Sequence, residues 1–365
     1  MAYVITMAIA LVGGWFVPWF GMKVIMTRRF KSGKHQTTNY AGKIVSYGLG
    51  LVWLVWAASL FFTLQISAYI SNFDNLARWI TFNGSSFSEA VLTISDGFFF
   101  YTFNTNYIAN SNFFNAAIPL VVSCFFFGWL DDRLGEKGDG GFKGHVKSLF
   151  QGKLTTGMVK VLGIGFTALV VSAAWFGLGL MDGSIFRFSW EYIYFIVLST
   201  CAIALSANLI NLFDLRPARA SKAYIFLIDQ AFFIIACTTL IVTLILGFSN
   251  FWAGIGRQFI YVLWLLGPIF AIWRFDAGEK AMLGDAGANP AGALVGFYVV
   301  AGLFYTAVGL VVLLPLYVLV VLALNLLSEK YSFSKLIEDI PLLKRIDMLG
   351  RPIQKERSAT KQNYK

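Results

Sequence analysis

Carboxylate and amide side chains gather in three short stretches of this 365-residue chain, each beside a long apolar run. The stretches are Asp131-Asp132, Asn208-x-x-Asn211-x-x-Asp214 and Gly284-Asp285-x-Gly287. Oxygen ligands of this kind suit Mg²⁺, which binds carboxylates together with phosphate oxygens and retained waters. If the three stretches meet in space, the sequence predicts a magnesium site that takes a phosphorylated substrate.

Each stretch alone also has a purely structural interpretation. The aspartate pair could be a solvated helix end, and Asn208 and Asn211 could join helices through hydrogen bonds. The Gly-Asp-x-Gly stretch is typical of a tight turn as well as of a phosphate site, where glycine lets the backbone approach a ligand. After it we expect Asn289 to cap a helix whose first residue is Pro290.

The elements that position these stretches must be membrane helices. The chain is 58% hydrophobic and only 13% charged, which excludes an ordinary soluble domain and a disordered chain. Runs of about 20 apolar residues mark the spans. The predicted fold is an all-α polytopic membrane protein with nine spans: 3–22, 44–66, 113–130, 161–181, 192–212, 224–248, 259–273, and two within 291–327 that separate near Gly302.

Loop charges predict the orientation, because cytoplasmic loops collect Lys and Arg. With the N-terminus outside, all but three of the 29 Lys and Arg residues fall on the cytoplasmic side, in 23–43, 131–160, 213–223, 274–290 and the basic tail 328–365. The net charge of +10 therefore indicates cytoplasmic loops rather than nucleic-acid binding. Residues 1–327 form the predicted membrane domain. The outside segment 67–112 includes a candidate re-entrant helix at 91–103.

The three stretches, in this order, resemble the motifs of the polyprenyl-phosphate N-acetylhexosamine-1-phosphate transferases. This superfamily includes phospho-N-acetylmuramoyl-pentapeptide transferase and undecaprenyl-phosphate N-acetylglucosamine 1-phosphate transferase. The aspartate pair resembles the family's own pair, and the second and third stretches resemble its Asn-x-x-Asn-x-x-Asp and Gly-Asp-x-Gly-Ser motifs. Residues 39–42 and the stretch 154–160, which ends in Lys160, are similar to further family segments.

The resemblance implies transfer of a sugar 1-phosphate from a UDP-sugar to polyprenyl phosphate, with release of UMP, in the bacterial cytoplasmic membrane for cell-wall glycan synthesis. It implies Mg²⁺ as cofactor, polyprenyl phosphate, UDP-sugar and membrane lipids as partners, and leaves a homodimer open. The implied roles are catalysis by Asp131, Asp132 and Asp285, metal binding by Asp285 and Asn211, and substrate binding by Lys160, Asn208, Asp214, Gly284 and Gly287.

Three features depart from the family pattern. Residues 215–222 are basic where the family commonly has a glycine-rich stretch, so these cations could either grip phosphates or anchor the loop. The only histidines are His35 and His145, so a histidine-rich loop motif is absent, and Ala288 stands where Ser is usual. The altered loop leaves an alternative function open, that of a catalytically silent paralogue which binds the lipid carrier or a partner enzyme.

Overall fold

The computed structural model describes residues 8–33, 36–39, 42–65, 106–135, 148, 151–153, 155–178, 190–246, 251–304, 306 and 308–351. The predicted re-entrant segment 91–103, His35 and His145 lie outside these ranges. The helices are η1 Leu11–Phe16, α2 Val17–Ser32, η2 Leu49–Leu51, α6 Asn106–Leu134, α8 Thr156–Leu178, α9 Trp190–Phe213, α10 Arg219–Leu246, α11 Phe251–Asp276, α12 Asp285–Leu303, η4 Gly309–Leu313, α13 Leu314–Lys330, α14 Phe333–Asp339 and α15 Pro341–Met348.

Eight helical segments of the described chain are long and apolar enough to cross a membrane. They are Ala8–Ser32, Phe113–Leu134, Thr156–Phe176, Trp190–Phe213, Arg219–Ile245, Gln258–Asp276, Asp285–Leu303 and Gly309–Lys330. A shorter apolar helix covers Leu49–Gln65. The chain is therefore a predominantly helical, multi-pass membrane protein. The 37-residue apolar run divides as expected, since α12 ends at Leu303 and the next helical segment begins at Gly309.

Several predicted boundaries are wrong, among them those of the first two spans. The span predicted for 44–66 begins as a strand, because β2 (Ile44–Tyr47) pairs with two other short strands before the helix starts. The first span does not end at Met22, since its helix continues to Ser32. Hydropathy marks apolar length only, and it cannot detect a buried strand or a polar helix extension.

A small three-stranded sheet, which the sequence analysis did not predict, accompanies the helices of this predominantly α-helical chain. β1 (Gln36–Thr38) runs antiparallel to β2, and β2 runs parallel to β3 (Ala281–Met282). In the second pairing Tyr47 lies opposite Met282, so the sheet joins the segment before the helix Leu49–Gln65 to the segment before α12. This small sheet thereby fixes where α12 begins.

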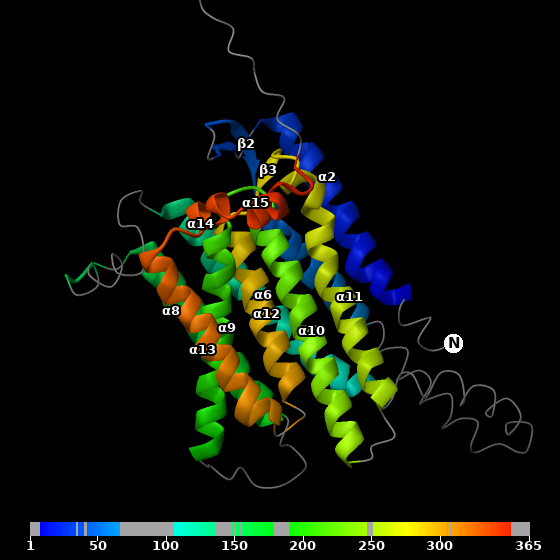
Figure 1. The fold of residues 1–365 in the computed structure, drawn as a ribbon. Coiled ribbons are helices and arrows are strands. Elements are labelled where there is room, and N and C mark those ends of the chain that lie inside the picture. The colour runs from blue at the N-terminus through cyan, green and yellow to red at the C-terminus, as the bar shows by residue number, and fades with distance from the viewer. Residues whose placement is uncertain are drawn as a thin grey trace, which may run out of the picture.

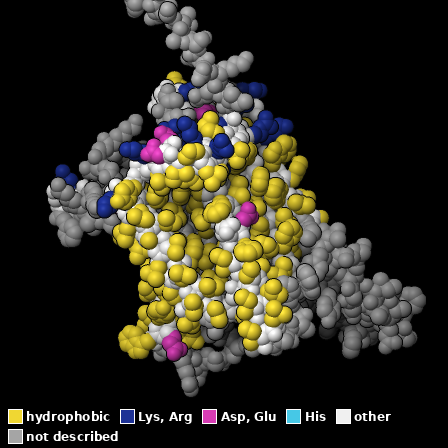
Figure 2. Space-filling model, viewed as in Figure 1, with side chains coloured by type: hydrophobic (Ala, Val, Ile, Leu, Met, Phe, Trp, Pro, Cys, Tyr) yellow, Lys and Arg dark blue, Asp and Glu magenta, His cyan; other side chains and the backbone are white. Residues whose placement is uncertain are grey.

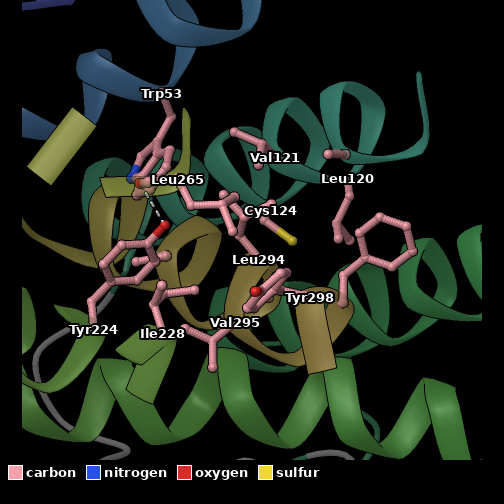
Figure 3. Close-up of a cluster of buried hydrophobic side chains, with 14 of the residues drawn as sticks. Trp53, Leu120, Val121, Cys124, Tyr224, Ile228, Leu265, Leu294, Val295 and Tyr298 are labelled. Atoms are coloured by element: carbon pink, nitrogen blue, oxygen red, sulfur yellow. Dashed lines mark hydrogen bonds between the residues drawn. The ribbon is translucent and has the colours of Figure 1, made fainter. Parts of the chain in front are cut away.

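Helix α12 forms the centre of the bundle, since every residue from Ala286 to Leu303 is buried. Its glycines allow close helix packing: a Cβ on Gly292 would lie 2.6 Å from the Cα of Ala207 on α9. On another side, the Trp53 indole donates a 2.8 Å hydrogen bond to the Gly287 carbonyl. Figure 3 shows Trp53 and Tyr224 in the surrounding cluster of buried side chains.

The polar segments gather at one end of the bundle. Figure 1 shows β2, β3, α14 and α15 at the same end, and Figure 2 shows Lys and Arg side chains there above a largely hydrophobic middle. Hydrogen bonds confirm the grouping, because Asp132, Tyr47 and the start of α12 contact one another. The described parts of the predicted cytoplasmic segments thus share one side.

Candidate functional site

The aspartate pair lies within the last turns of α6, which continues to Leu134, beyond the predicted end of the span at Leu130. The Asp132 carboxylate accepts the backbone N–H of Asp285 at 3.2 Å and that of Ala286 at 2.8 Å. These N–H groups belong to the first turn of α12, where they lack helical partners and favour negative charge. The sequence stretches around residues 132 and 285 therefore meet directly.

Lys160 joins the same two stretches from a third helix. Its ammonium group lies 2.7 Å from an Asp131 oxygen and also pairs with the Asp285 carboxylate. Lys160 lies near the start of α8, in a helix and not in the predicted loop 131–160. Because α6, α8 and α12 each supply one or two of these side chains, we call Asp131, Asp132, Lys160 and Asp285 the carboxylate–lysine site.

Tyr47 is a member of the site that sequence reasoning missed. Its hydroxyl donates to the Asp132 carboxylate, and Arg29 donates to the Tyr47 carbonyl at 2.6 Å. Burial, reinforced by the Asp132 charge, raises the pKa of the Tyr47 hydroxyl, which keeps it a donor. Tyr47 lies inside an apolar run that predicted a span, so only recognition of the strand could have singled it out.

Two glycines permit this geometry. Gly284 has a φ of +68°, a value that side chains other than glycine rarely adopt, and a Cβ there would lie 2.8 Å from the Tyr47 ring. Gly128 faces the start of α12, where a Cβ would lie 2.6 Å from the Asp285 carbonyl carbon. Glycine at 128 therefore lets the end of α6 reach α12, which the sequence analysis did not anticipate.

Helix α12 begins at Asp285, so the prediction that Asn289 caps it and Pro290 opens it is wrong. Gly284 occupies the cap position, and its carbonyl accepts the N–H of Gly287 at 2.9 Å. The Asn289 amide instead donates to the Asp285 carbonyl from within the helix. The prediction rested on the preference of proline for the first turn of a helix, but Pro290 lies inside α12.

The side chains of the Asn-x-x-Asn-x-x-Asp stretch lie in different surroundings. The Asn208 amide donates to Asn325 on α13 at 2.6 Å and so joins two helices. The Asn211 side-chain oxygen is buried without a hydrogen-bond partner among the described residues. Burial raises the pKa of Asp214 well above its ordinary range, the charges of Asp276 and Asp285 raise it further, and a hydrogen bond from the Gly284 backbone opposes them.

In the carboxylate–lysine site, the aspartate carboxylates outnumber the lysine cation. In the described ranges, Lys160 is the single cationic side chain paired with Asp131 or Asp285. No group of three His, Cys, Asp or Glu side chains in those same ranges is arranged to hold a metal ion by itself. Mg²⁺ commonly uses one or two carboxylates and takes its other ligands from phosphates and water. Asp285 and the orphaned oxygen of Asn211 fit that smaller donor set.

The basic segment 215–222, whose residues from Arg219 onward form the start of α10 and not a loop as predicted, contacts the C-terminal helices. Arg219 pairs with Asp347 of α15 through two hydrogen bonds of 2.8 and 3.0 Å, and Arg216 pairs with Glu338 of α14. Lys222 donates to the Ile346 carbonyl at 3.0 Å. Of the two roles that the sequence left open, anchoring fits these contacts better than gripping phosphates.

In comparisons with known proteins, no family model matches the chain and no curated protein matches it. The site therefore stands on its own geometry, in which three polar stretches come together at one end of a membrane-embedded bundle.

Proposed function

We propose that the chain transfers a sugar 1-phosphate from a UDP-sugar to polyprenyl phosphate, in a reaction that depends on Mg²⁺ and releases UMP. One observation carries the proposal: Asp131 and Asp285, distant in sequence, both pair with Lys160 at the polar end of the bundle, where Asp132 accepts the first N–H groups of α12. The same end carries the basic segments expected in the cytoplasm. The proposed location is the cytoplasmic membrane of a bacterium, with the site facing the cytoplasm.

The charge balance supports a phosphorylated substrate bound with a cation. Carboxylates alone repel a diphosphate, so a site rich in aspartate binds one only when a divalent ion balances the charge. Bound there, Mg²⁺ neutralises diphosphate oxygens and stabilises the leaving group. Asp285 and Asn211 are its proposed ligands. Lys160 would contact the diphosphate directly, as a compact point charge.

In the proposed reaction, an oxygen of the lipid phosphate attacks the phosphorus that bears the sugar. A new phosphorus–oxygen bond forms as the bond to the UMP oxygen breaks, and UMP leaves with that electron pair. The attacking phosphate is largely ionised at neutral pH, so Asp131 and Asp132 are proposed to orient it and to accept any remaining proton. Holding the two phosphates in line is the main task of the chain.

The acceptor explains why such an enzyme would lie in the membrane. Each buried methylene of a polyprenyl tail contributes about 0.8 kcal/mol, so the lipid does not leave the bilayer. A site at the polar end of an apolar bundle would lie near the membrane surface, which is where the lipid phosphate lies. The aspartates at the end of α6 lie at such a level, since the apolar part of that helix ends just before them.

The test is UMP release by the purified full chain supplied with polyprenyl phosphate, Mg²⁺ and a panel of UDP-sugars. We expect turnover with at least one donor, loss of it on chelation of Mg²⁺, and a fall of about 10²–10³-fold for Asp285→Ala. Asp339→Ala is the matched control, because that carboxylate is exposed at the end of α14. Equal activity of the two variants would contradict the proposal.

A second candidate is a catalytically silent paralogue that binds the lipid carrier. The observation that favours it is the basic segment 215–222, in which Arg219 pairs with Asp347 of α15 and Arg216 with Glu338 of α14. Under this alternative, the protein binds polyprenyl phosphate but turns over no donor in the panel. Binding that persists in Asp285→Ala without UMP release from the unsubstituted chain would favour it.

A further inference from the structure

Tyr47 contacts two separate elements that position the carboxylate–lysine site. Its backbone lies in β2 and pairs with Met282 of β3, two residues before Gly284. Its hydroxyl donates to the Asp132 carboxylate near the end of α6. One residue therefore joins the segment that precedes α12 to the last turns of α6.

The Asp132 carboxylate accepts hydrogen bonds on both of its oxygens. One oxygen accepts the Asp285 backbone N–H at 3.2 Å, and the other accepts the Ala286 N–H at 2.8 Å together with the Tyr47 hydroxyl. An ionised carboxylate has about four acceptor positions, so these three donors leave it little freedom to turn. The Tyr47 hydroxyl is the one donor of the three that comes from outside α12.

Asp131 has different surroundings from its neighbour. One of its oxygens lies 2.7 Å from the Lys160 Nζ, which also pairs with the Asp285 carboxylate. Adjacent residues of a helix point in different directions. The aspartate pair therefore divides its contacts: Asp131 pairs with the lysine, and Asp132 binds the first turn of α12.

The side chain of Tyr47 is itself held in place. Arg29 of α2 donates to the Tyr47 carbonyl at 2.6 Å, and Gly48 leaves room for that guanidinium, since a Cβ there would lie 2.6 Å from the Arg29 Nη1. The Tyr47 ring lies against Gly284, where a Cβ would lie 2.8 Å from a ring carbon. A hydroxyl fixed through its backbone and its ring can orient a partner.

We infer that Tyr47 is a positioning residue of the proposed transferase. By holding the Asp132 carboxylate, it fixes the first turn of α12 and with it Asp285, the proposed Mg²⁺ ligand. The effect on turnover rests on the proposed function, whereas the effect on the first turn of α12 requires no activity. Replacing a residue that orients a metal ligand commonly lowers metal affinity or activity about 10–100-fold.

The first test is independent of activity. Tyr47→Phe removes the hydroxyl and keeps the ring and the strand pairing. In the purified full chain without metal or substrate, we expect amide hydrogen exchange over residues 285–288 to rise about 2–10-fold, as for the loss of one hydrogen bond. Tyr331→Phe loses the same hydroxyl at an exposed position after α13 and should leave this exchange unchanged. In the Asp132→Ala background, Tyr47→Phe should raise the exchange no further, because the hydroxyl acts through that carboxylate.

The second test measures UMP release. Tyr47→Phe should lower kcat about 10–100-fold and leave KM for both substrates nearly unchanged, because the hydroxyl acts through Asp132 and not through a substrate contact. Exchange over residues 285–288 that matches the Tyr331→Phe control, or an unchanged kcat, would overturn the inference. If the unsubstituted chain releases no UMP, the proposed function fails, and the exchange result alone decides whether Tyr47 positions the first turn of α12.

Discussion

The Ala286 backbone N–H donates a 2.8 Å hydrogen bond to the Asp132 carboxylate, so the end of α6 caps the start of α12. Asp132 thereby has a structural role that does not depend on any ligand. Its carboxylate is also placed where the partial positive charge of the α12 N-terminus is strongest. A side chain held in this way keeps its position when substrate arrives, which suits both the structural and the proposed catalytic interpretations.

Substitutions at Asp132 separate these two roles. Asp132→Ala removes both hydrogen bonds to α12 and should lower the free energy of unfolding by about 1–2 kcal/mol, the usual effect of losing a helix cap. Asp132→Asn keeps one acceptor oxygen for one of the two N–H groups, so its thermal midpoint should fall by less than that of Asp132→Ala. If the charge also acts in phosphoryl transfer, Asp132→Asn should still lose UMP release. Equal thermal midpoints for the two variants would show that the cap contributes little.

Lys160→Gln should leave Asp131 and Asp285 without their cation. Breaking a fully buried pair costs several kcal/mol, but these side chains are 14–25% exposed, so we expect about 1–3 kcal/mol of destabilisation. Millimolar Mg²⁺ should raise the thermal midpoint of this variant more than that of the unsubstituted chain, because the freed carboxylates can bind it. Lys153→Gln, at an exposed position, is the control and should show neither effect.

The membrane spans, and the placement of the polar stretches at one end of them, could be predicted from the sequence, because both depend on local features. Apolar length marks a span, and a carboxylate beside a span must lie near the membrane surface. The shared end for Asp132 and Asp285 followed from loop charges alone. These inferences needed no knowledge of which helices pack together.

Contacts set by packing could not be predicted in this way. Tyr47 enters the site through a short strand hidden in an apolar run, and Gly128 is required only because α6 touches α12. The pairing of Arg219 with Asp347 joins residues more than a hundred positions apart in the chain. Charge and hydropathy patterns carry no information on such partners.

Gly128→Ala should separate α6 from α12, because its Cβ would lie 2.6 Å from the Asp285 carbonyl carbon. Overpacking of this kind costs about 1–3 kcal/mol, which a thermal melt in detergent would report. Gly165→Ala is a matched control in α8, since a Cβ there meets no atom within 4 Å. If both variants melt alike, the close approach of the two helices is not required.

Asp214→Asn should stabilise the protein in the absence of metal and substrate. Burial and the charges of Asp276 and Asp285 raise the pKa of Asp214, so the folded chain holds this proton more tightly than the unfolded chain. Stability is then greatest below the unfolded pKa of about 3.9 and is lost as pH rises toward the raised value. Asparagine does not titrate, so Asp214→Asn removes this loss of stability at higher pH.

Thermal midpoints measured from pH 4 upward should therefore fall less steeply for Asp214→Asn than for the unsubstituted chain. Asp339→Asn is a suitable control, because that carboxylate is exposed. Parallel pH profiles for all three proteins would contradict a raised pKa of Asp214 in the folded chain.

Arg219→Gln should detach the C-terminal helices from the bundle. Arg219 and Asp347 are 4% and 8% exposed, and the substitution removes two hydrogen bonds between them and a third to Ser334. We expect about 1–3 kcal/mol of destabilisation for this contact, with Arg351 still paired to Asp347. Amide hydrogen exchange over residues 333–348 should rise accordingly.

Arg216→Gln should change this exchange little, because the side chains of Arg216 and Glu338 are 33% and 43% exposed. Such surface pairs contribute about 0–1 kcal/mol. Protection in α15 that survives Arg219→Gln would mean that its apolar contacts, and not this ion pair, hold the helix in place.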